Sequence, residues 1–387
     1  MIKQILINKD LRHYLKLFLI TFLPVCFILL PFYLKLNKLL FLNLNDKGLI
    51  NIYQNWDGPN YLIVAKSNYD LETTRKLLIT NTPDTYFTAH LPLYPYLIRI
   101  VSIIIPILPI AGLFVNFVFS FLLNLLFFKF IKDKTKHPYF AVFVFTLFPA
   151  RIFVTRNIIA PEPMLMFLTL LSLVFADNKM FLKSAVAFSL SILTKLQNIV
   201  ILPAFFIYYI LQDIKRKLNK QTILKYLYLA IPVTAVFLVF YFYYLKTGDF
   251  FIYFKVQELN NLQMSLPFSQ FDKTAVWVDN IWLEEIIFYY LFLFFAGITL
   301  IEQKKHLYGF AVLIYTAFLT TLPHNDIVRF SSSVIPFVYL AFAKIFDSRA
   351  FRLAFILTLP AIYFFTLNFI LHNQAPVADW SYLWFSR

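Results

Sequence analysis

Long apolar runs recur along the whole sequence and constrain its fold more than any other feature. The runs of about 18 to 22 apolar residues are each long enough to cross a hydrocarbon core of roughly 30 Å as a helix. Because backbone N–H and C=O groups cannot face lipid unpaired, these runs must be helices and not open strands. The sequence therefore predicts an all-α, polytopic membrane protein instead of two or three soluble domains.

Composition supports this prediction. Charged residues make up 14% of the 387 residues, against about 25% in a typical soluble domain. The net charge of +15 would indicate nucleic-acid binding in a soluble protein, but basic residues also collect in the cytoplasmic loops of membrane proteins. We therefore expect a lipid bilayer as partner and no nucleic acid. Cys26 is the only cysteine, so no intramolecular disulfide is expected.

About eleven membrane-spanning helices are predicted, within a single transmembrane domain that covers 1–387. The first run has the length of a signal peptide, but no small-residue cleavage site follows it, so we expect a retained helix. The predicted ranges are 15–36, 109–131, 138–156, 162–176, 181–195, 197–212, 225–245, 284–301, 307–322, 332–346 and 351–372.

Short basic segments set the predicted orientation. The N-terminus, 129–136 and 215–225 are rich in Lys and Arg, which places them in the cytoplasm. The N-terminus and 129–136 can share a side only if an even number of spans separates them. The apolar stretch 91–106 must then not cross. Because it contains three prolines and Arg99, we interpret it as an interfacial segment.

This orientation leaves three segments on the extracytoplasmic face: the first loop at 37–108, the second loop at 246–283 and the tail at 373–387. We interpret the second loop as a solvated cap. We expect an integral protein of the plasma membrane of a prokaryote, with a cytoplasmic N-terminus and an extracytoplasmic active site.

The first loop contains the most informative acidic residue. Asp57 follows Trp56 and precedes Gly58 and Pro59, just beyond the first span, where a lipid-borne substrate presents its phosphate. There its carboxylate could act as a general base on an acceptor hydroxyl. The alternative is structural, because Asp-Gly-Pro is ordinary turn or N-cap chemistry.

Charged residues elsewhere can serve the same cavity or have structural roles. Glu162 could be a second acidic group of the site, or it could favour the start of a helix through the helix dipole. Arg156 could bind phosphate or pair with Glu162. Lys195 could bind phosphate or extend its ammonium to the membrane surface. Arg329 suits phosphate because its guanidinium donates two parallel hydrogen bonds, but it could instead pair with Asp326.

Three classes of function compete. An interfacial enzyme needs acidic and basic groups near one membrane face. A transporter or lipid flippase usually has Gly- or Pro-broken helices in repeated halves, whereas this chain has six glycines and no repeat. A non-catalytic assembly subunit would leave Asp57 and Arg329 without a shared purpose. If the chain is an enzyme, Asp57 should lie within about 15 Å of Glu162 or Arg329, since catalytic groups must nearly touch one substrate.

The order of these features resembles the GT-C superfamily of integral-membrane glycosyltransferases. The resemblance is to its GPI mannosyltransferase (PIG-V)-like and dolichyl-phosphate-mannose-protein mannosyltransferase-like branch, and it extends to about residue 336. The similar landmarks are Trp56-Asp57 with Tyr61-Leu62, the segment from His90 through Tyr94 to Pro95 with Arg99, Pro149 to Pro163 with Glu162, Thr194-Lys195, and Arg329 to Pro336. Two departures are Pro161, where the family often has Ser or Thr, and the lack of a second acidic residue beside Asp57.

The resemblance implies inverting transfer of a sugar, mannose or another hexose, from a polyprenyl-phosphate donor to a glycolipid, glycan or protein acceptor. It implies Asp57 as the catalytic base. We expect neither a cofactor nor a metal, because no nucleotide-binding or metal-ligand motif occurs. The catalytic candidates are Asp57 and Glu162, and the substrate-binding candidates are Trp56, Tyr61, His90, Tyr94, Arg156, Lys195 and Arg329.

Overall fold

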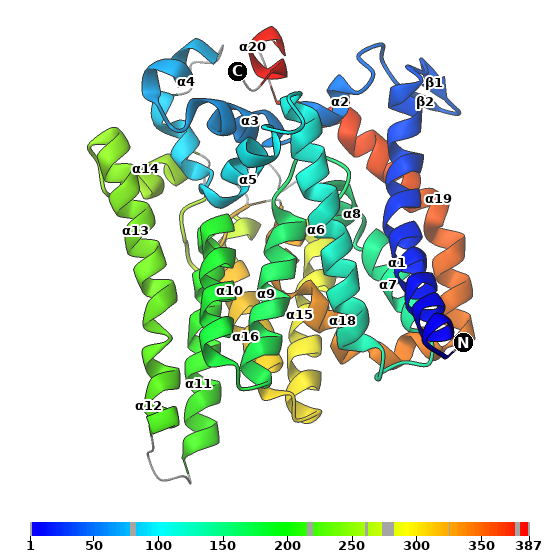
Figure 1. The fold of residues 1–387 in the computed structure, drawn as a ribbon, viewed down its shortest axis with the longest axis vertical. Coiled ribbons are helices and arrows are strands. Elements are labelled where there is room, and N and C mark those ends of the chain that lie inside the picture. The colour runs from blue at the N-terminus through cyan, green and yellow to red at the C-terminus, as the bar shows by residue number, and fades with distance from the viewer. Residues whose placement is uncertain are drawn as a thin grey trace.

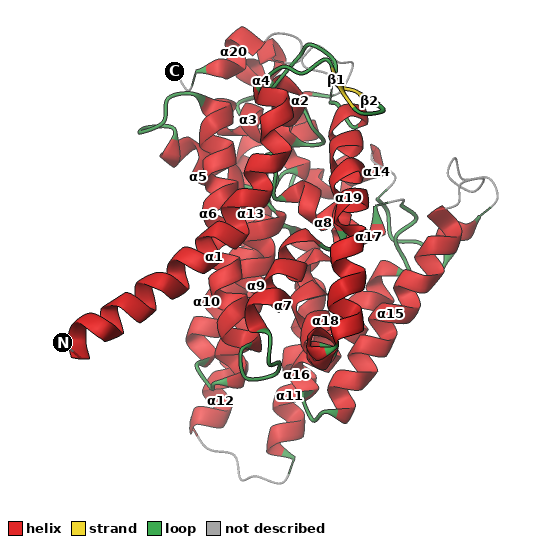
Figure 2. Ribbon diagram, turned by 90° about the vertical axis from the view of Figure 1, so that its right-hand side faces the viewer, coloured by secondary structure: helices red, strands yellow, loops and turns green. Residues whose placement is uncertain are grey.

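The described part of the chain is built almost entirely of helices, as the apolar runs predict. The computed structural model describes residues 2–77, 83–214, 220–259, 262–272, 282–324, 326–375 and 380–385. Within those ranges the strands are β1 (Lys38–Leu39) and β2 (Leu42–Asn43), which form a small antiparallel hairpin. The predicted all-α class is confirmed (Figures 1 and 2).

Among the described residues, six helices are long and apolar enough to cross a membrane. They are formed by α1 (Ile2–Tyr33), α6 (Leu108–Ile131), η2 with α11 (Leu196–Ile201 and Leu202–Asp213), α12 with α13 (Lys220–Leu227 and Ala230–Thr247), α15 (Trp282–Glu302) and α19 (Arg349–His372). Shorter helices include α9 (Glu162–Asp177), α10 (Phe181–Thr194) and α16 (His306–Leu319). These helices fit a membrane protein, whereas the number of crossings stays a prediction.

Two predicted helices do not form one long apolar helix. The range 138–156 is divided at the Phe148-Pro149 bond into α7 (Pro138–Leu147) and α8 (Ala150–Thr155). Proline interrupts a helix because it has no N–H to donate. The range 332–346 consists of η4 (Ser331–Val334), α18 (Ile335–Ala341) and η5 (Ala343–Asp347), and α17 (Ile327–Phe330) precedes them. The prediction of single helices over these two ranges was wrong.

The first loop folds into short helices instead of a further span. They are α2 (Ile50–Tyr53), α3 (Gly58–Ser67), α4 (Leu71–Leu77), η1 (Asp84–Ala89) and α5 (Leu93–Val101). With 9 residues, α5 is only about 13 Å long at roughly 1.5 Å per residue, far short of a bilayer core. Its end leads to Ile103 and Ile104, which are 78% and 85% exposed, as expected of a segment that contacts lipid.

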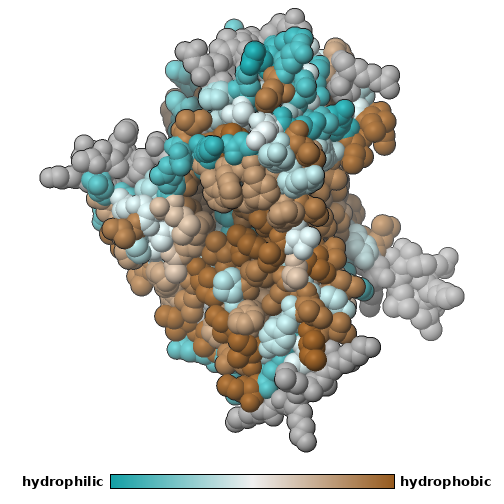
Figure 3. All heavy atoms as spheres, turned by 90° about the vertical axis from the view of Figure 1, so that its left-hand side faces the viewer, coloured by the Kyte–Doolittle hydropathy of each residue, from teal (hydrophilic) through white to brown (hydrophobic). Residues whose placement is uncertain are grey.

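The two ends of the helix bundle differ in what they carry. Figures 1 and 2 show the first-loop helices together with β1, β2 and α20 (Trp380–Trp384) at one end, with α14 (Ile252–Leu259) toward that end. The connections from α6 to α7 and from α15 to α16 lie at the other end, and they contain the basic residues near 132–136 and 304–305. In Figure 3 hydrophilic side chains gather toward the upper end, and the surface below them is mainly hydrophobic.

Part of what the sequence predicts lies outside the described residues. This concerns 215–219 in a basic connection, 273–281 in the second loop, and 376–379 and 386–387 in the tail. The assignment of the basic end to the cytoplasm stays a prediction.

At the centre of the bundle, α9 packs against α6 and α10 and also contacts η4. The first turn of α9 is thereby placed beside α17, close to the end that carries the first loop. This packing positions the charged side chains described next.

Candidate active site

The turn that carries Asp57 has an unusual backbone and is attached to the end of α19. Trp56 has φ 47°, in the left-handed region that bulky residues rarely adopt. Its backbone N–H donates to the carbonyl of Asn373 at 2.9 Å, and its ring meets the Phe369 ring edge-on at 4.6 Å. Strained conformations of this kind concentrate at functional sites, so we regard the turn as a candidate for function.

The Asp57 carboxylate does not cap the helix that follows. It makes no side-chain cap hydrogen bond to α3, so the simple N-cap interpretation is wrong for this residue. Its Oδ2 instead lies 3.1 Å from Nη1 of Arg329, and its Oδ1 lies 3.8 Å from Nε2 of His90. Burial opposes ionisation of Asp57, but the charges of Arg329 and Lys195 and the contact with His90 lower its pKa well below the usual value for a carboxyl. The group is therefore ionised at neutral pH.

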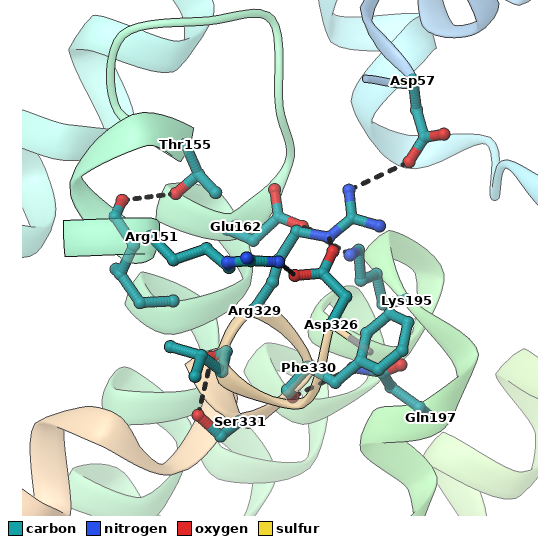
Figure 4. A network of polar contacts seen from close by, with 12 residues as sticks. Asp57, Arg151, Thr155, Glu162, Lys195, Gln197, Asp326, Arg329, Phe330 and Ser331 are labelled. Atoms are coloured by element: carbon teal, nitrogen blue, oxygen red, sulfur yellow. Dashed lines mark hydrogen bonds and ion pairs between the residues drawn. The ribbon is translucent and has the colours of Figure 1, made fainter. Parts of the chain in front are cut away.

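Arg329, on α17, joins three carboxylates. Besides Asp57, its Nε lies 2.6 Å from Oδ2 of Asp326 and 3.8 Å from Oε1 of Glu162. Its guanidinium also lies over the Trp56 ring, 4.5 Å from the ring centre. Of the two predicted roles of Arg329, pairing with Asp326 is confirmed (Figure 4), and phosphate binding stays a prediction.

Glu162 and Lys195 form a second ion pair beside Arg329. The Nζ of Lys195 lies 2.5 Å from Oε1 of Glu162, whose side chain is fully buried. Lys195 ends α10 in an extended conformation, and its side chain is 14% exposed. It therefore does not extend to the membrane surface. The other oxygen of Glu162, Oε2, is buried and has no hydrogen-bond partner in the described part of the chain, so it retains the capacity to accept one.

Arg151, which the sequence analysis did not select, completes this group of charged residues. Its Nη1 lies 2.9 Å from Oδ1 of Asp326. The carboxylates of Asp57, Glu162 and Asp326 thus face the cations of Lys195, Arg329 and Arg151. With the histidines neutral, the formal charges of these six residues cancel. We call them the charged cluster.

A cavity of about 180 Å³ opens beside this cluster. Its lining combines ionised groups with neutral polar and aromatic ones. The lining residues are Asp57, Tyr61, Tyr86, Ala89, His90, Leu91, Thr194, Lys195, Leu196, Gln197, Tyr253, Gln257, Leu262, His324, Arg329 and Phe330. His90 lies between the rings of Tyr61 and Tyr86, and its Nδ1 is buried with no hydrogen-bond partner within the described ranges.

Four predicted site residues do not line this cavity. Trp56 and Glu162 lie behind Arg329, which each of them contacts. Tyr94 is fully buried and meets the Tyr61 ring at 5.1 Å, so it supports the cavity wall. Arg156 lies elsewhere, with Nη1 donating to Oδ1 of Asn124 at 3.2 Å. Of the two roles predicted for Arg156, pairing with Glu162 is absent among the described ion pairs, and phosphate binding in this cavity would require it to move.

Several cavity residues were not predicted as site residues. Gln197 has a weak sequence signal, because it lies two positions after Lys195 in the same polar interruption. Tyr253 and Gln257 are four residues apart and share one face of α14, but they lie in the loop that we interpreted as a solvated cap. Within the described ranges, no group of three or more His, Cys, Asp or Glu side chains is arranged to hold a metal ion.

The site is thus a polar cavity beside a charged cluster, toward the end of an apolar helical bundle. It can bind an anion through Lys195 and Arg329, and it presents the carboxylate of Asp57 next to that anion. Comparison of the chain with protein-family models, with curated proteins and with solved structures finds no match.

Proposed function

We propose that the protein is a membrane glycosyltransferase that moves a sugar, mannose or another hexose, from a polyprenyl-phosphate donor to an acceptor hydroxyl. One observation carries the proposal. Asp57, Glu162, Lys195 and Arg329 come from four separate segments and form a single connected cluster at one cavity. The landmarks of the sequence resemblance to GT-C enzymes include these four residues, so the resemblance and the geometry support the same site.

Each charged group then has a chemical task. Arg329 and Lys195 would bind the donor phosphate, since both face the cavity and both form charge-assisted hydrogen bonds with oxyanions. The acceptor oxygen attacks the anomeric carbon while the bond from that carbon to the phosphate oxygen breaks. The polyprenyl phosphate leaves with the bonding electrons, and Asp57 takes the proton of the acceptor hydroxyl. Attack opposite the leaving group inverts the configuration.

Donor binding would also make Asp57 a stronger base. In the unliganded site the guanidinium of Arg329 holds the pKa of Asp57 low against the effect of burial, and a weak base removes protons poorly. A phosphate that binds Arg329 shares its positive charge between two anions. The pKa of Asp57 then rises toward the range in which a carboxylate can accept a proton.

The surroundings suit a lipid-linked donor. The described part of the chain has six helices long and apolar enough to cross a membrane, and residues of the first loop line the cavity, where a phosphate headgroup would lie. The location in a prokaryotic plasma membrane, with the site outside the cytoplasm, belongs to the same proposal. The acceptor is a glycolipid, a glycan or a protein.

Sugar transfer by the purified protein in lipid nanodiscs tests the proposal. Synthetic polyprenyl-phosphate hexoses serve as donors, and wild type is compared with Asp57→Asn. Asp46→Asn is a matched control, because Asp46 is an exposed acid of the same loop. We expect Asp57→Asn to slow transfer by about 10²- to 10⁴-fold, the usual contribution of a general base, and Asp46→Asn to leave the rate unchanged. Equal transfer by wild type and Asp57→Asn would remove Asp57 as the base. Absence of transfer from every donor would favour another class, such as a transporter or flippase.

A further inference from the structure

The second loop forms one wall of the cavity and is more than a cap. Within this loop, α14 packs against η1 of the first loop. Ile252 and Val256 face inward and are buried. Tyr253 follows Ile252 and Gln257 follows Val256, and both Tyr253 and Gln257 line the cavity.

The wall around α14 carries no formal charge on the side that faces the cavity. The residues that form it are Tyr86, Tyr253, Gln257 and Leu262, and we call them the neutral wall. The charged side chains of α14 point elsewhere. Lys255 is 65% exposed and pairs with Asp249 at 2.5 Å, and Glu258 is exposed. The charged lining residues Asp57, Lys195 and Arg329 come from other segments of the chain.

The polar groups of the neutral wall suit hydroxyl ligands. Gln257 hydrogen-bonds to the hydroxyl of Tyr253, whereas its own Oε1 is buried and has no hydrogen-bond partner among the described residues. Burial raises the pKa of Tyr253 to about 12, so its phenol stays protonated and can donate. A sugar hydroxyl both donates and accepts, so it can satisfy the free Oε1, and a buried acceptor left unpaired is costly.

The cavity also limits the size of the ligand. Its volume of about 180 Å³ is below the roughly 300 Å³ at which pockets for drug-sized molecules begin. One monosaccharide ring, or part of it, fits this space, and a longer glycan must extend beyond it. Aromatic side chains such as those of Tyr86 and Tyr253 can pack against the apolar C–H face of such a ring.

We propose that the neutral wall of Tyr86, Tyr253, Gln257 and Leu262 is a subsite for an uncharged pyranose ring, in the same cavity as the phosphate-binding residues. The ring belongs either to the donor or to a carbohydrate acceptor. The role of this subsite in sugar transfer rests on the proposed function, but binding of the ring can be measured without turnover.

The test is ligand-observed NMR on the purified protein in nanodiscs, with methyl α-D-mannopyranoside, methyl α-D-glucopyranoside and inorganic phosphate as separate probes. We expect at least one glycoside to bind wild type and to bind Gln257→Leu and Tyr253→Phe about tenfold more weakly, while phosphate binding is unchanged. A tenfold change corresponds to about 1.4 kcal/mol. Glu258→Gln, on the exposed face of α14, is the matched control. The double variant of Arg329→Gln with Asp326→Asn, which keeps the charged cluster formally neutral, should show the opposite pattern, with phosphate binding lost and glycoside binding kept.

Three results would overturn the subsite. In the first, no glycoside binds to wild type. In the second, a glycoside binds but neither neutral-wall variant weakens its binding. In the third, wild type binds a Thr-containing peptide instead of a glycoside, and the neutral-wall variants abolish that peptide binding. Transfer kinetics of Gln257→Leu then identify the source of the ring, through a raised KM for the donor or for the acceptor. Glycoside binding that depends on the neutral wall, in a protein that transfers no sugar, would refute the proposed function and leave the subsite standing.

Discussion

Replacing Arg329 by Gln should be among the most destabilising single changes in the protein. The Arg329 side chain is 11% exposed and contacts three carboxylates, of which Glu162 is fully buried and Asp326 is 5% exposed. Without Arg329, the two remaining cations of the charged cluster face all three carboxylates. Removing one partner of a buried ion pair typically costs about 3 to 5 kcal/mol, because a buried charge is left uncompensated. We expect a loss of that size for Arg329→Gln.

A double variant separates this electrostatic cause from a general packing defect. Arg329→Gln combined with Asp326→Asn removes one charge of each sign, so the cluster returns to formal neutrality. The double variant should therefore be more stable than Arg329→Gln alone, with a coupling of about 1 to 3 kcal/mol between the two sites. Neither variant should transfer sugar, because both lack the phosphate-binding guanidinium.

The free energies can be measured by denaturant unfolding in mixed micelles, followed by circular dichroism. Arg349→Gln is the control, since Arg349 is exposed and surface changes usually stay within about 0.5 kcal/mol. A loss below about 1 kcal/mol in Arg329→Gln, or a double variant that loses the full sum of the two single changes, would refute the claim that the cluster is a coupled, charge-balanced unit.

Three further predictions concern the turn that carries Asp57. Asn55→Ala should cost about 1 to 3 kcal/mol and slow transfer, because the buried Asn55 amide donates to a carbonyl of α19 at 2.8 Å; full activity would show that this tether does not position the turn. Gly58→Ala should destabilise by about 1 to 3 kcal/mol, since a Cβ there would lie 2.8 Å from the Tyr53 carbonyl oxygen; an unchanged unfolding curve would contradict this. Although burial opposes it, Arg329 holds the pKa of Asp57 low, so the ionised carboxylate stabilises the native state above the unfolded-state pKa of about 3.9. The difference in unfolding free energy between wild type and Asp57→Asn should therefore be constant from neutral pH down to about pH 5 and shrink below about pH 4, and a difference that shrinks already near neutral pH would contradict this.

Much of the helical architecture could be predicted because its cause is local. A run of apolar residues needs no partner to prefer a helix in lipid, so the long apolar helices follow from composition and length alone. Proline also acts locally, and its effect at Pro149 was underestimated, because the apolar pattern of 138–156 continues through the break. Within the first loop, the short helix at Leu93–Val101 agrees with the charge pattern, which required that segment not to cross.

The candidate residues could be selected from the sequence, but their partners could not. Asp57, Glu162, Lys195 and Arg329 are charges in or beside apolar surroundings, and a charge there is costly unless it is paired or functional. The sequence does not say which charge meets which. It offered Arg156 as a partner of Glu162, whereas Glu162 pairs with Lys195, 33 positions away.

The sequence by itself determined a helical membrane protein with a few charged residues that require an explanation. Only the tertiary structure decided that Asp57 and Arg329, 272 positions apart, lie in contact, and that α14 of the second loop closes the same cavity. The physical reason is that helix formation depends on neighbours within one or two turns, whereas an ion pair or a cavity depends on how distant helices pack. That packing places α9, α10, α17 and the first loop around one point, and it alone turns separate charges into a site.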